Sequence, residues 1–252
     1  MKKHLGLLVL ILNILGAGCG KNGPDCFQVT GEVVGEVLPL PSFSRITVFE
    51  NVKIVLKHGD TQEVFLETGE NLRSDITAEV VEGTLELRDG NSCNYLRPYG
   101  NTTFYITTPD LEEVRSSTGW PIRSDGILPF TDLKLISESF NNEETGTTDG
   151  SFELVLDVDR LSVVVNGIAY FNLKGSADRF SVVIAAGDSR IDARDLAAGS
   201  VVVRHRGSND ILVNPVNAIS GLINGYGDVL SYNRPAEIDV EETFRGRLIF
   251  VE

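Results

Sequence analysis

Residues 159–167 read DRLSVVVNG, and residues 178–187 read DRFSVVIAAG. Two such similar phrases, so close together in one chain, indicate a structural repeat. Related segments begin at Ser200 (SVVVRHRG) and Ser220 (SGLINGYG), and a second short strand-like segment follows each of the four. A period of about 20 residues with short strands in each repeat is typical of a solenoid, in which like residues stack on like from coil to coil.

This pattern predicts an all-β protein. Val and Ile alternate with polar residues, and no long apolar stripe with a helical period follows the N-terminal segment. We expect a parallel β-helix of coils of about 19–21 residues, preceded by a β-strand-rich N-terminal part. The predicted boundaries are 1–18 for a signal peptide, 19–26 for a tether, 27–110 for the N-terminal β region and 111–252 for the coils.

The repeats also predict which side chains face inward. Alignment on the four serines gives an inward apolar set and leaves the serines Ser162, Ser181, Ser200 and Ser220 as an outward polar ladder. The predicted inward residues are Leu161, Val163, Val165, Phe180, Val182, Ile184, Val201, Val203, Ile219 and Ile223.

A second outward ladder is apolar in this alignment and consists of Val164, Val183, Val202 and Leu222. One explanation is ordinary β-propensity on a surface strand. The other is a buried contact with a second copy of the chain or with the N-terminal strands, which makes these four residues a candidate interface.

The N-terminus predicts export. A basic start, Lys2 and Lys3, precedes an apolar run that is too short to span a membrane, and small residues lead to Cys19. This pattern resembles a bacterial lipobox, in which the cysteine is acylated, although Gly16 stands where leucine is usual. We expect a chain that is lipid-anchored at Cys19 in the cell envelope; ordinary signal cleavage to a secreted protein is the alternative.

The mature chain would keep two further cysteines, Cys26 and Cys93. Exported proteins meet an oxidising compartment, so a disulfide between them is expected, and it would contribute about 4 kcal/mol by chain entropy. Two buried free thiols are the alternative.

Net charge excludes one class of partner. The chain has 36 acidic and 22 basic residues, a formal net charge of −14. Such a chain repels phosphate backbones, so we expect no nucleic-acid binding.

No catalytic motif is present in the sequence: there is no G-x-S-x-G, P-loop, H-E-x-x-H or EF-hand loop. We therefore predict neither enzymatic activity nor a cofactor. Asp188, Asp210 and Asp228 follow corresponding turns, where aspartate commonly accepts backbone hydrogen bonds, with a calcium site as the less favoured alternative. His205 lies in the basic segment RHRG, which we interpret as a solvated turn rather than a patch for anionic glycans or lipids.

Three longer segments carry a family resemblance: residues 43–72 (FSRITVFENVKIVLKHGDTQEVFLETGENL), 80–97 (VVEGTLELRDGNSCNYLR) and 224–238 (NGYGDVLSYNRPAEI). Together they resemble the head GIN domain family of autotransporter adhesins, from about Phe43 to Val251. The resemblance implies a right-handed β-helix on exported, often lipid-anchored envelope proteins. The chain keeps the Gly-x-Gly turn expected of the family in GYGD but lacks it in NGIAYF and SESFNN.

Three functional hypotheses follow. The first is a non-enzymatic envelope lipoprotein whose β-helical surface serves adhesion or scaffolding, with a glycan or protein as ligand. The second is a polysaccharide-active enzyme on the same fold, which requires acidic residues converging in a cleft. The third is a structural module that assembles with copies of itself.

Overall fold

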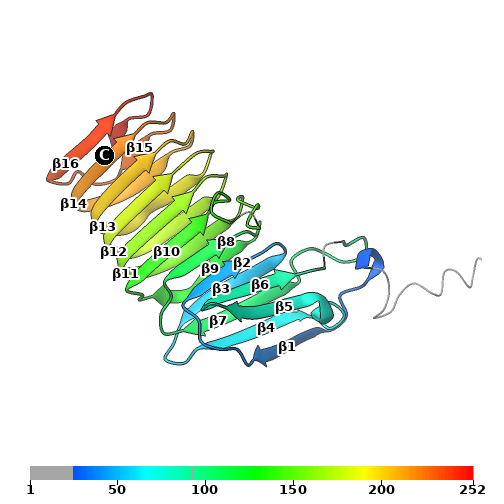
Figure 1. The fold of residues 1–252 in the computed structure, drawn as a ribbon. Coiled ribbons are helices and arrows are strands. Elements are labelled where there is room, and N and C mark those ends of the chain that lie inside the picture. Colours follow the sequence, from blue (N-terminus) through cyan, green and yellow to red (C-terminus); the bar gives the residue numbers. More distant parts are fainter. Residues whose placement is uncertain (1–24, 92, 143, 252) are drawn as a thin grey trace, which may run out of the picture.

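The computed structural model describes residues 25–91, 93–142 and 144–251, so the predicted signal peptide and Cys19 lie outside the described part. The chain is all-β, as predicted. Seventeen strands form one continuous, curled sheet (Figure 1), and the described residues contain no α-helix, only the 3₁₀ helices η1 (Asp25–Phe27) and η2 (Arg73–Asp75).

In chain order the strands are β1 (Val33–Leu38), β2 (Arg45–Val48), β3 (Val52–His58), β4 (Glu63–Gly69), β5 (Ile76–Val81), β6 (Thr84–Asp89), β7 (Thr102–Thr108), β8 (Glu113–Ser116), β9 (Pro121–Leu128), β10 (Asp132–Ser137), β11 (Ser151–Val165), β12 (Tyr170–Ile184), β13 (Arg190–His205), β14 (Ile211–Ile223), β15 (Val229–Ser231), β16 (Glu237–Glu242) and β17 (Leu248–Phe250).

The strands build two parallel ladders. The first half of β11 pairs with β9 and its second half pairs with β10. Both halves of β11 then pair in parallel with β12, and the ladders continue through β13 and β14 to β16 and β17 (Figure 1). Each coil therefore lies on the coil before it.

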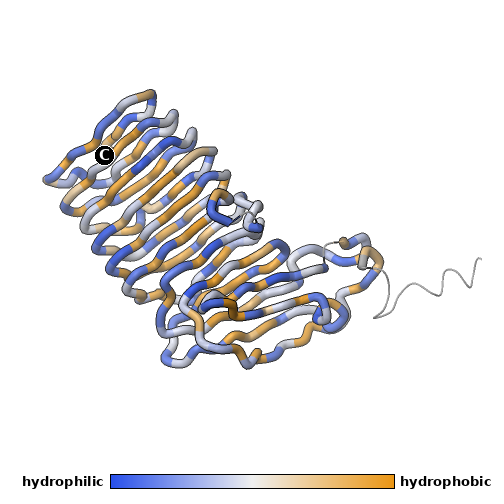
Figure 2. The backbone as a smooth tube through the Cα atoms, viewed as in Figure 1, coloured by the Kyte–Doolittle hydropathy of each residue, from blue (hydrophilic) through white to orange (hydrophobic). Residues whose placement is uncertain are grey.

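The core lies between the two ladders. Val163, Val182 and Val203 are paired in register across three coils and are fully buried. In the other ladder Phe152 and Phe171 stack with ring centroids 4.6 Å apart. All ten residues predicted to face inward are buried, which confirms that part of the repeat alignment. Figure 2 shows hydrophobic and hydrophilic residues interspersed along the stacked strands.

The predicted serine ladder is wrong at its third rung. Ser162 pairs with Ser181 as expected, but Ser181 pairs with Val202. Ser200 lies opposite Arg179 instead.

The cause is two extra residues. Turn 185–189 is one residue longer than turn 166–169, and β13 runs from Asp192 to Asp195 where β12 runs from Asn172 to Lys174, which adds a second residue. Such a bulge shifts the register of everything after it. Alignment on the serines ignores both extra residues, and because the total shift is two, the inward residues stay inward.

The same shift interrupts the predicted apolar ladder. Val164 and Val183 are paired, but the next residue in their row is Arg204, which separates them from Leu222. Val202 lies in the serine row and is 43% exposed. The prediction of one continuous apolar stripe is therefore wrong, although Val164, Val183 and Leu222 are each half-buried.

The N-terminal strands are stacked in an order that differs from their order in the chain. β2 pairs in parallel with β6 on one side and β8 on the other, and β3 likewise lies between β7 and β9. Parallel pairing therefore already begins in strands that precede residue 111, which is the predicted start of the coils, and it continues after that residue. Beyond β6 and β7 the pairing becomes antiparallel, through β5 on one ladder and β4 and β1 on the other.

The close approach of the coils makes Gly221 a critical position. Gly221 has φ +128°, and a Cβ there would lie 1.9 Å from the carbonyl oxygen of Val203. We expect Gly221→Ala to lower the free energy of unfolding by about 1–3 kcal/mol or more, because both the backbone angle and the clash oppose it. Gly146→Ala, where no atom lies within 4 Å, is the control and should unfold like the parent. Equal thermal unfolding midpoints for the two variants would contradict this stacking geometry.

Candidate functional site

One edge of the stack carries the turns that join the two ladders. Most of them are short, for example 166–169, 185–189, 206–210 and 224–228. Two connections on this edge are longer. We call the one between β6 and β7 the Cys93 loop (residues 90, 91 and 93–101) and the one between β10 and β11 the Glu138 loop (residues 138–142 and 144–150).

The stacking order places these two loops on either side of two short turns. Because β2 and β3 lie between the β6–β7 coil and the β8–β9 coil, turns 49–51 and 117–120 are neighbours and the long loops flank them. A depression of about 390 Å³ lies here, and we call it the groove. Its lining residues are Glu50, Asn51, Tyr99, Gly119, Trp120, Thr147 and Asp149.

Trp120, the sole tryptophan of the chain, is held firmly in the groove wall. The Nζ atom of Lys53 lies 4.3 Å from the centroid of its ring, and the same ammonium donates a 2.8 Å hydrogen bond to the carbonyl of Gly100. Gly100 has φ +71°, and a Cβ there would lie 2.6 Å from Cζ2 of Trp120. The ring therefore packs against the backbone of the Cys93 loop, which leaves no space for a side chain at Gly100.

The other groove residues supply one more ring and several oxygen atoms. Tyr99 is 63% exposed. The hydroxyl of Thr147 donates a 2.9 Å hydrogen bond to Oε1 of Glu50, which joins turn 49–51 to the Glu138 loop. A Cβ at Gly119 would lie 3.6 Å from Oδ1 of Asp149, so this carboxylate lies over that turn. Neither Glu50 nor Asp149 forms an ion pair with the described part of the chain.

The Glu138 loop is fixed at its base by the buried carboxylate after which we name it. Glu138 is 2% exposed, and Arg115 Nη1 donates a 2.8 Å hydrogen bond to its Oε1. The backbone N–H of Phe140 and the side chain of Asn141 also donate to it. Burial alone would raise the pKa of Glu138, but these hydrogen bonds and the charge of Arg115 together lower the pKa below its usual value. The carboxylate is therefore ionised and holds the start of the loop.

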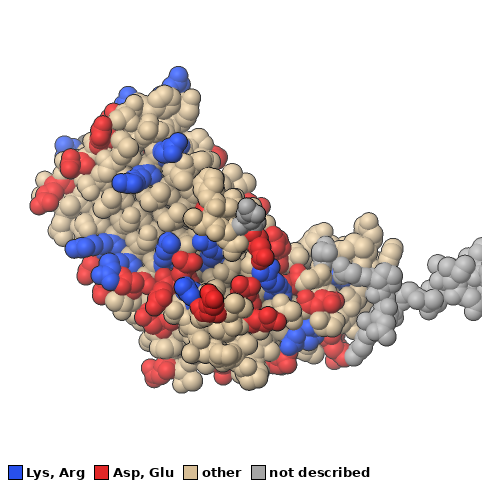
Figure 3. Space-filling model, viewed as in Figure 1, with Lys and Arg blue, Asp and Glu red and all other residues tan. Residues whose placement is uncertain are grey.

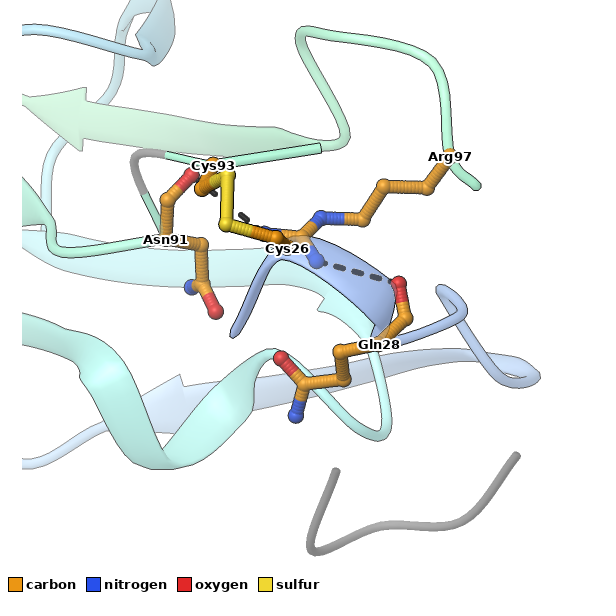
Figure 4. Close-up of a disulfide and its surroundings, with 5 residues drawn as sticks. All are labelled: Cys26, Gln28, Asn91, Cys93 and Arg97. Atoms are coloured by element: carbon orange, nitrogen blue, oxygen red, sulfur yellow. Dashed lines mark hydrogen bonds between the residues drawn. A yellow bond between two sulfur atoms is a disulfide. The ribbon is translucent and has the colours of Figure 1, made fainter. Parts of the chain in front are cut away.

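The Cys93 loop is fixed by a covalent bond. Cys26 and Cys93 form a disulfide with a Cα–Cα distance of 4.4 Å, as predicted (Figure 4). The N–H of Tyr95 donates a 2.8 Å hydrogen bond to the carbonyl of Cys26. Arg97, only 7% exposed, reaches past the disulfide and donates a 3.0 Å bond to the carbonyl of Gln28.

His205 is not part of a solvated turn, which corrects the interpretation of RHRG. It is 0% exposed and lies in an inward row between Ile184 and Ile223. Its Nδ1 accepts a 3.3 Å hydrogen bond from the N–H of Gly207. Burial lowers the pKa of His205, and neighbouring carbonyl groups and carboxylates oppose only part of that shift. The two flanking arginines are exposed.

Two of the three turn aspartates accept hydrogen bonds from backbone N–H groups, as predicted. Oδ1 of Asp210 accepts a 2.9 Å bond from the N–H of Asp228, and Oδ1 of Asp228 accepts a 2.8 Å bond from the N–H of Arg247. Asp188 is out of register with these two and accepts a bond from Ser208 instead. Within the described residues, no group of three or more His, Cys, Asp or Glu side chains is placed to hold a metal ion.

Two aromatic rings and two carboxylates line a depression at a loop-bearing edge, which makes the groove the candidate ligand site. Sequence reasoning missed its residues. Two signals were present: the sole tryptophan follows a turn glycine, and residues 137–151 interrupt the repeat.

In the described part of the chain, no helix is long and apolar enough to cross a membrane. Charged side chains of both signs cover much of the face seen in Figure 3, mainly in the half nearer the N-terminal strands.

Fold and groove together define an all-β protein with one curled sheet and a loop-bounded surface depression. The chain belongs to the family described as "Putative auto-transporter adhesin, head GIN domain", whose model matches residues 42–235. The resemblance drawn from the sequence is thereby confirmed.

Solved structures share this fold. A "putative adhesin" from Bacteroides fragilis is similar with a TM-score of 0.76 and 18% identity, over 87% of this chain and 97% of that one. A "putative adhesin" from Parabacteroides distasonis gives 0.64 and 15%, over 88% and 98%. A "putative lipid binding protein" from the same species gives 0.57 and 17%, over 89% and 99%. At these identities the likeness concerns the fold alone. No curated protein matches the chain.

The buried imidazole makes stability depend on pH. Since the pKa of His205 is lower in the folded than in the unfolded chain, its contribution is complete above about pH 6.5 and is lost progressively as the pH falls toward the folded-state pKa. Urea unfolding at pH 8, 6 and 5 should show this loss, and His205→Ile should reduce it. His58→Gln, at an exposed site, is the control. An identical pH dependence in the parent and in His205→Ile would contradict the assignment.

The disulfide should matter for stability and for the Cys93 loop. Alkylation should find Cys26 and Cys93 unreactive until they are reduced. Replacing both cysteines with serine should lower the free energy of unfolding by about 2–4 kcal/mol, because the unfolded chain gains entropy. Denaturant titration measures this loss. Two reactive thiols before reduction, or an unchanged unfolding midpoint in the double variant, would count against the bond.

Proposed function

We propose that this protein is a non-enzymatic cell-envelope lipoprotein that serves adhesion or scaffolding by binding other molecules in the groove. Family membership supports a role in adhesion, because the family description names adhesins. The groove supports the specific part.

The arrangement of the two long loops is the observation that carries the proposal. Other coils of the stack close with short turns, so the fold itself does not require loops of this length. Both long loops border the same depression, and each is fixed at its base, one by a disulfide and one by Glu138. Binding residues are commonly carried on loops that a rigid scaffold positions.

The proposal also includes the type of fold and the membrane anchor. We propose that the coils form a right-handed parallel β-helix, which the two continuous parallel ladders support. We also propose that acylated Cys19 anchors the chain to the bacterial outer membrane, because small residues before a cysteine follow an apolar signal segment.

Polysaccharide cleavage is the second candidate function. Glu50 and Asp149 line one groove, and a pair of carboxylates is what glycoside hydrolysis uses. Self-assembly through the apolar ladder has less support, because Arg204 interrupts that ladder.

Bead adhesion tests the proposed binding function. Beads coated with residues 20–252 should be retained on at least one of four surfaces: mucin, fibronectin, collagen or purified bacterial envelope polysaccharide. Replacing residues 139–149 with a short Gly-Asn turn should abolish that retention. Beads coated with Tyr226→Ala, an exposed aromatic on a different turn of the same edge, should adhere like the parent. Retention that does not depend on the Glu138 loop, or retention on none of the four surfaces, would refute the proposal.

The same material distinguishes binding from cleavage. We expect no new reducing ends after incubation of the protein with the envelope polysaccharide. Reducing ends that disappear in Glu50→Gln would establish the enzymatic alternative instead.

A further inference from the structure

We infer that the groove binds a neutral saccharide chain, with one sugar ring lying against Trp120 and Tyr99 and its hydroxyl groups donating to Glu50 and Asp149. This inference rests on the proposed function, because it names the class of ligand that the same groove takes.

The size and the aromatic lining of the groove fit a sugar unit. Its volume of about 390 Å³ lies within the range of small-ligand sites, which is about 300–1,000 Å³. Trp120 and Tyr99 are contributed by different coils and both line the depression. A pyranose ring has a face of C–H groups that packs on the electron-rich face of an aromatic ring.

The polar atoms fit hydroxyl groups and disfavour anions. Glu50 and Asp149 are acceptors, and hydrogen bonds from a hydroxyl to a carboxylate are short and strong. The ammonium of Lys53 lies over the Trp120 ring and is already engaged with that ring and with the Gly100 carbonyl. Two carboxylates without ion-pair partners on a chain of net charge −14 repel a sulfated or uronic-acid polymer. The ligand is therefore a neutral saccharide.

The site is held in place before the ligand arrives. Lys53 and the Gly100 backbone hold the Trp120 ring, while Thr147 holds Glu50. The loops that frame the groove are fixed at the disulfide and at Glu138. Binding therefore does not need to order the Trp120 and Glu50 side chains, which lowers the entropic cost of association.

A peptide fits this place less well. Extended peptides gain affinity by pairing with an exposed sheet edge. The groove lies over turns 49–51 and 117–120, where strands end, and presents side chains instead of a free edge. Protein binding is therefore kept as an outcome of the test.

Tryptophan fluorescence reports directly on this site, because Trp120 is the sole tryptophan in the chain. The probes are the neutral hexasaccharides chitohexaose, cellohexaose and mannohexaose, and the anionic hexamers of heparin and polygalacturonate. At least one neutral probe should shift the emission of the 20–252 protein in a saturable way. The anionic probes should bind at least about tenfold more weakly.

Variants assign the effect to the groove. Tyr99→Ala should weaken binding of the neutral probe about tenfold, as should the double change Glu50→Gln with Asp149→Asn. Tyr99 is largely exposed, so its loss spares the fold. Trp120→Phe, followed by calorimetry, should weaken binding without abolishing it. The matched controls are Tyr226→Ala and Asp239→Asn, an exposed aromatic and an exposed carboxylate on other coils, and both should bind like the parent.

A glycan array separates the two sources of such chains, with one arm of bacterial envelope polysaccharides and one arm of animal glycans. Groove-dependent binding in either arm supports the inference and identifies the source. The inference is overturned if no neutral saccharide binds in solution or on the array, if anionic probes bind best, or if Tyr226→Ala weakens binding as much as Tyr99→Ala. If the beads still adhere to fibronectin or collagen through the groove in that case, the proposed function stands and the saccharide does not.

Discussion

Parallel, in-register stacking of the coils is the constraint on which the rest of the structure depends. Because each coil lies directly on the previous one, paired inward positions are buried together in the second halves of β11, β12 and β13. The row Val163, Val182 and Val203 is the direct result. Even His205 obeys this rule, since it lies in an inward row with isoleucine on both sides and is buried although it is polar.

The same constraint explains why the proposed binding residues lie at the edge. Because the strands of both ladders must stack, the long insertions lie where the chain turns between the ladders, and the strands themselves accommodate only small irregularities such as the bulge in β13. Both long loops on this edge border one depression, and each is fixed where it leaves the stack: the Cys93 loop by its disulfide and the Glu138 loop by a buried carboxylate with an arginine partner. The stacked strands form a rigid support, and the loops carry residues that line the groove.

The sequence predicted what depends on local pattern. Repetition of DRLSVVV and DRFSVVI indicated a structural repeat, and these two segments do pair in register in β11 and β12. Alternation within them identified the inward residues. The register of the outward rows was wrong, because the extra residue in turn 185–189 and the extra residue near Asp192 leave no mark in an alignment on serines. The burial of His205 was missed because its neighbours are two arginines, although its spacing from Val201 and Val203 placed it on the inward side.

The groove could not be predicted for a different reason. Glu50, Tyr99, Trp120 and Asp149 are far apart in the sequence, and they meet only because β2 and β3 are inserted between the β6–β7 and β8–β9 coils. No local sequence pattern shows that β2 and β3 lie between these two coils. The polar segment 137–151 interrupts the repeat in the sequence, but only the stacking order shows which turns this loop faces.

The most direct test of this account is a crystal structure of the protein grown in parallel with chitohexaose, cellohexaose and mannohexaose. The account predicts a sugar ring packed on Trp120 between the Cys93 loop and the Glu138 loop, with a hydroxyl group donating to Glu50 or Asp149. A saccharide bound on another part of the stack, or an unoccupied groove in all three crystals with Trp120 free of lattice contacts, would contradict it.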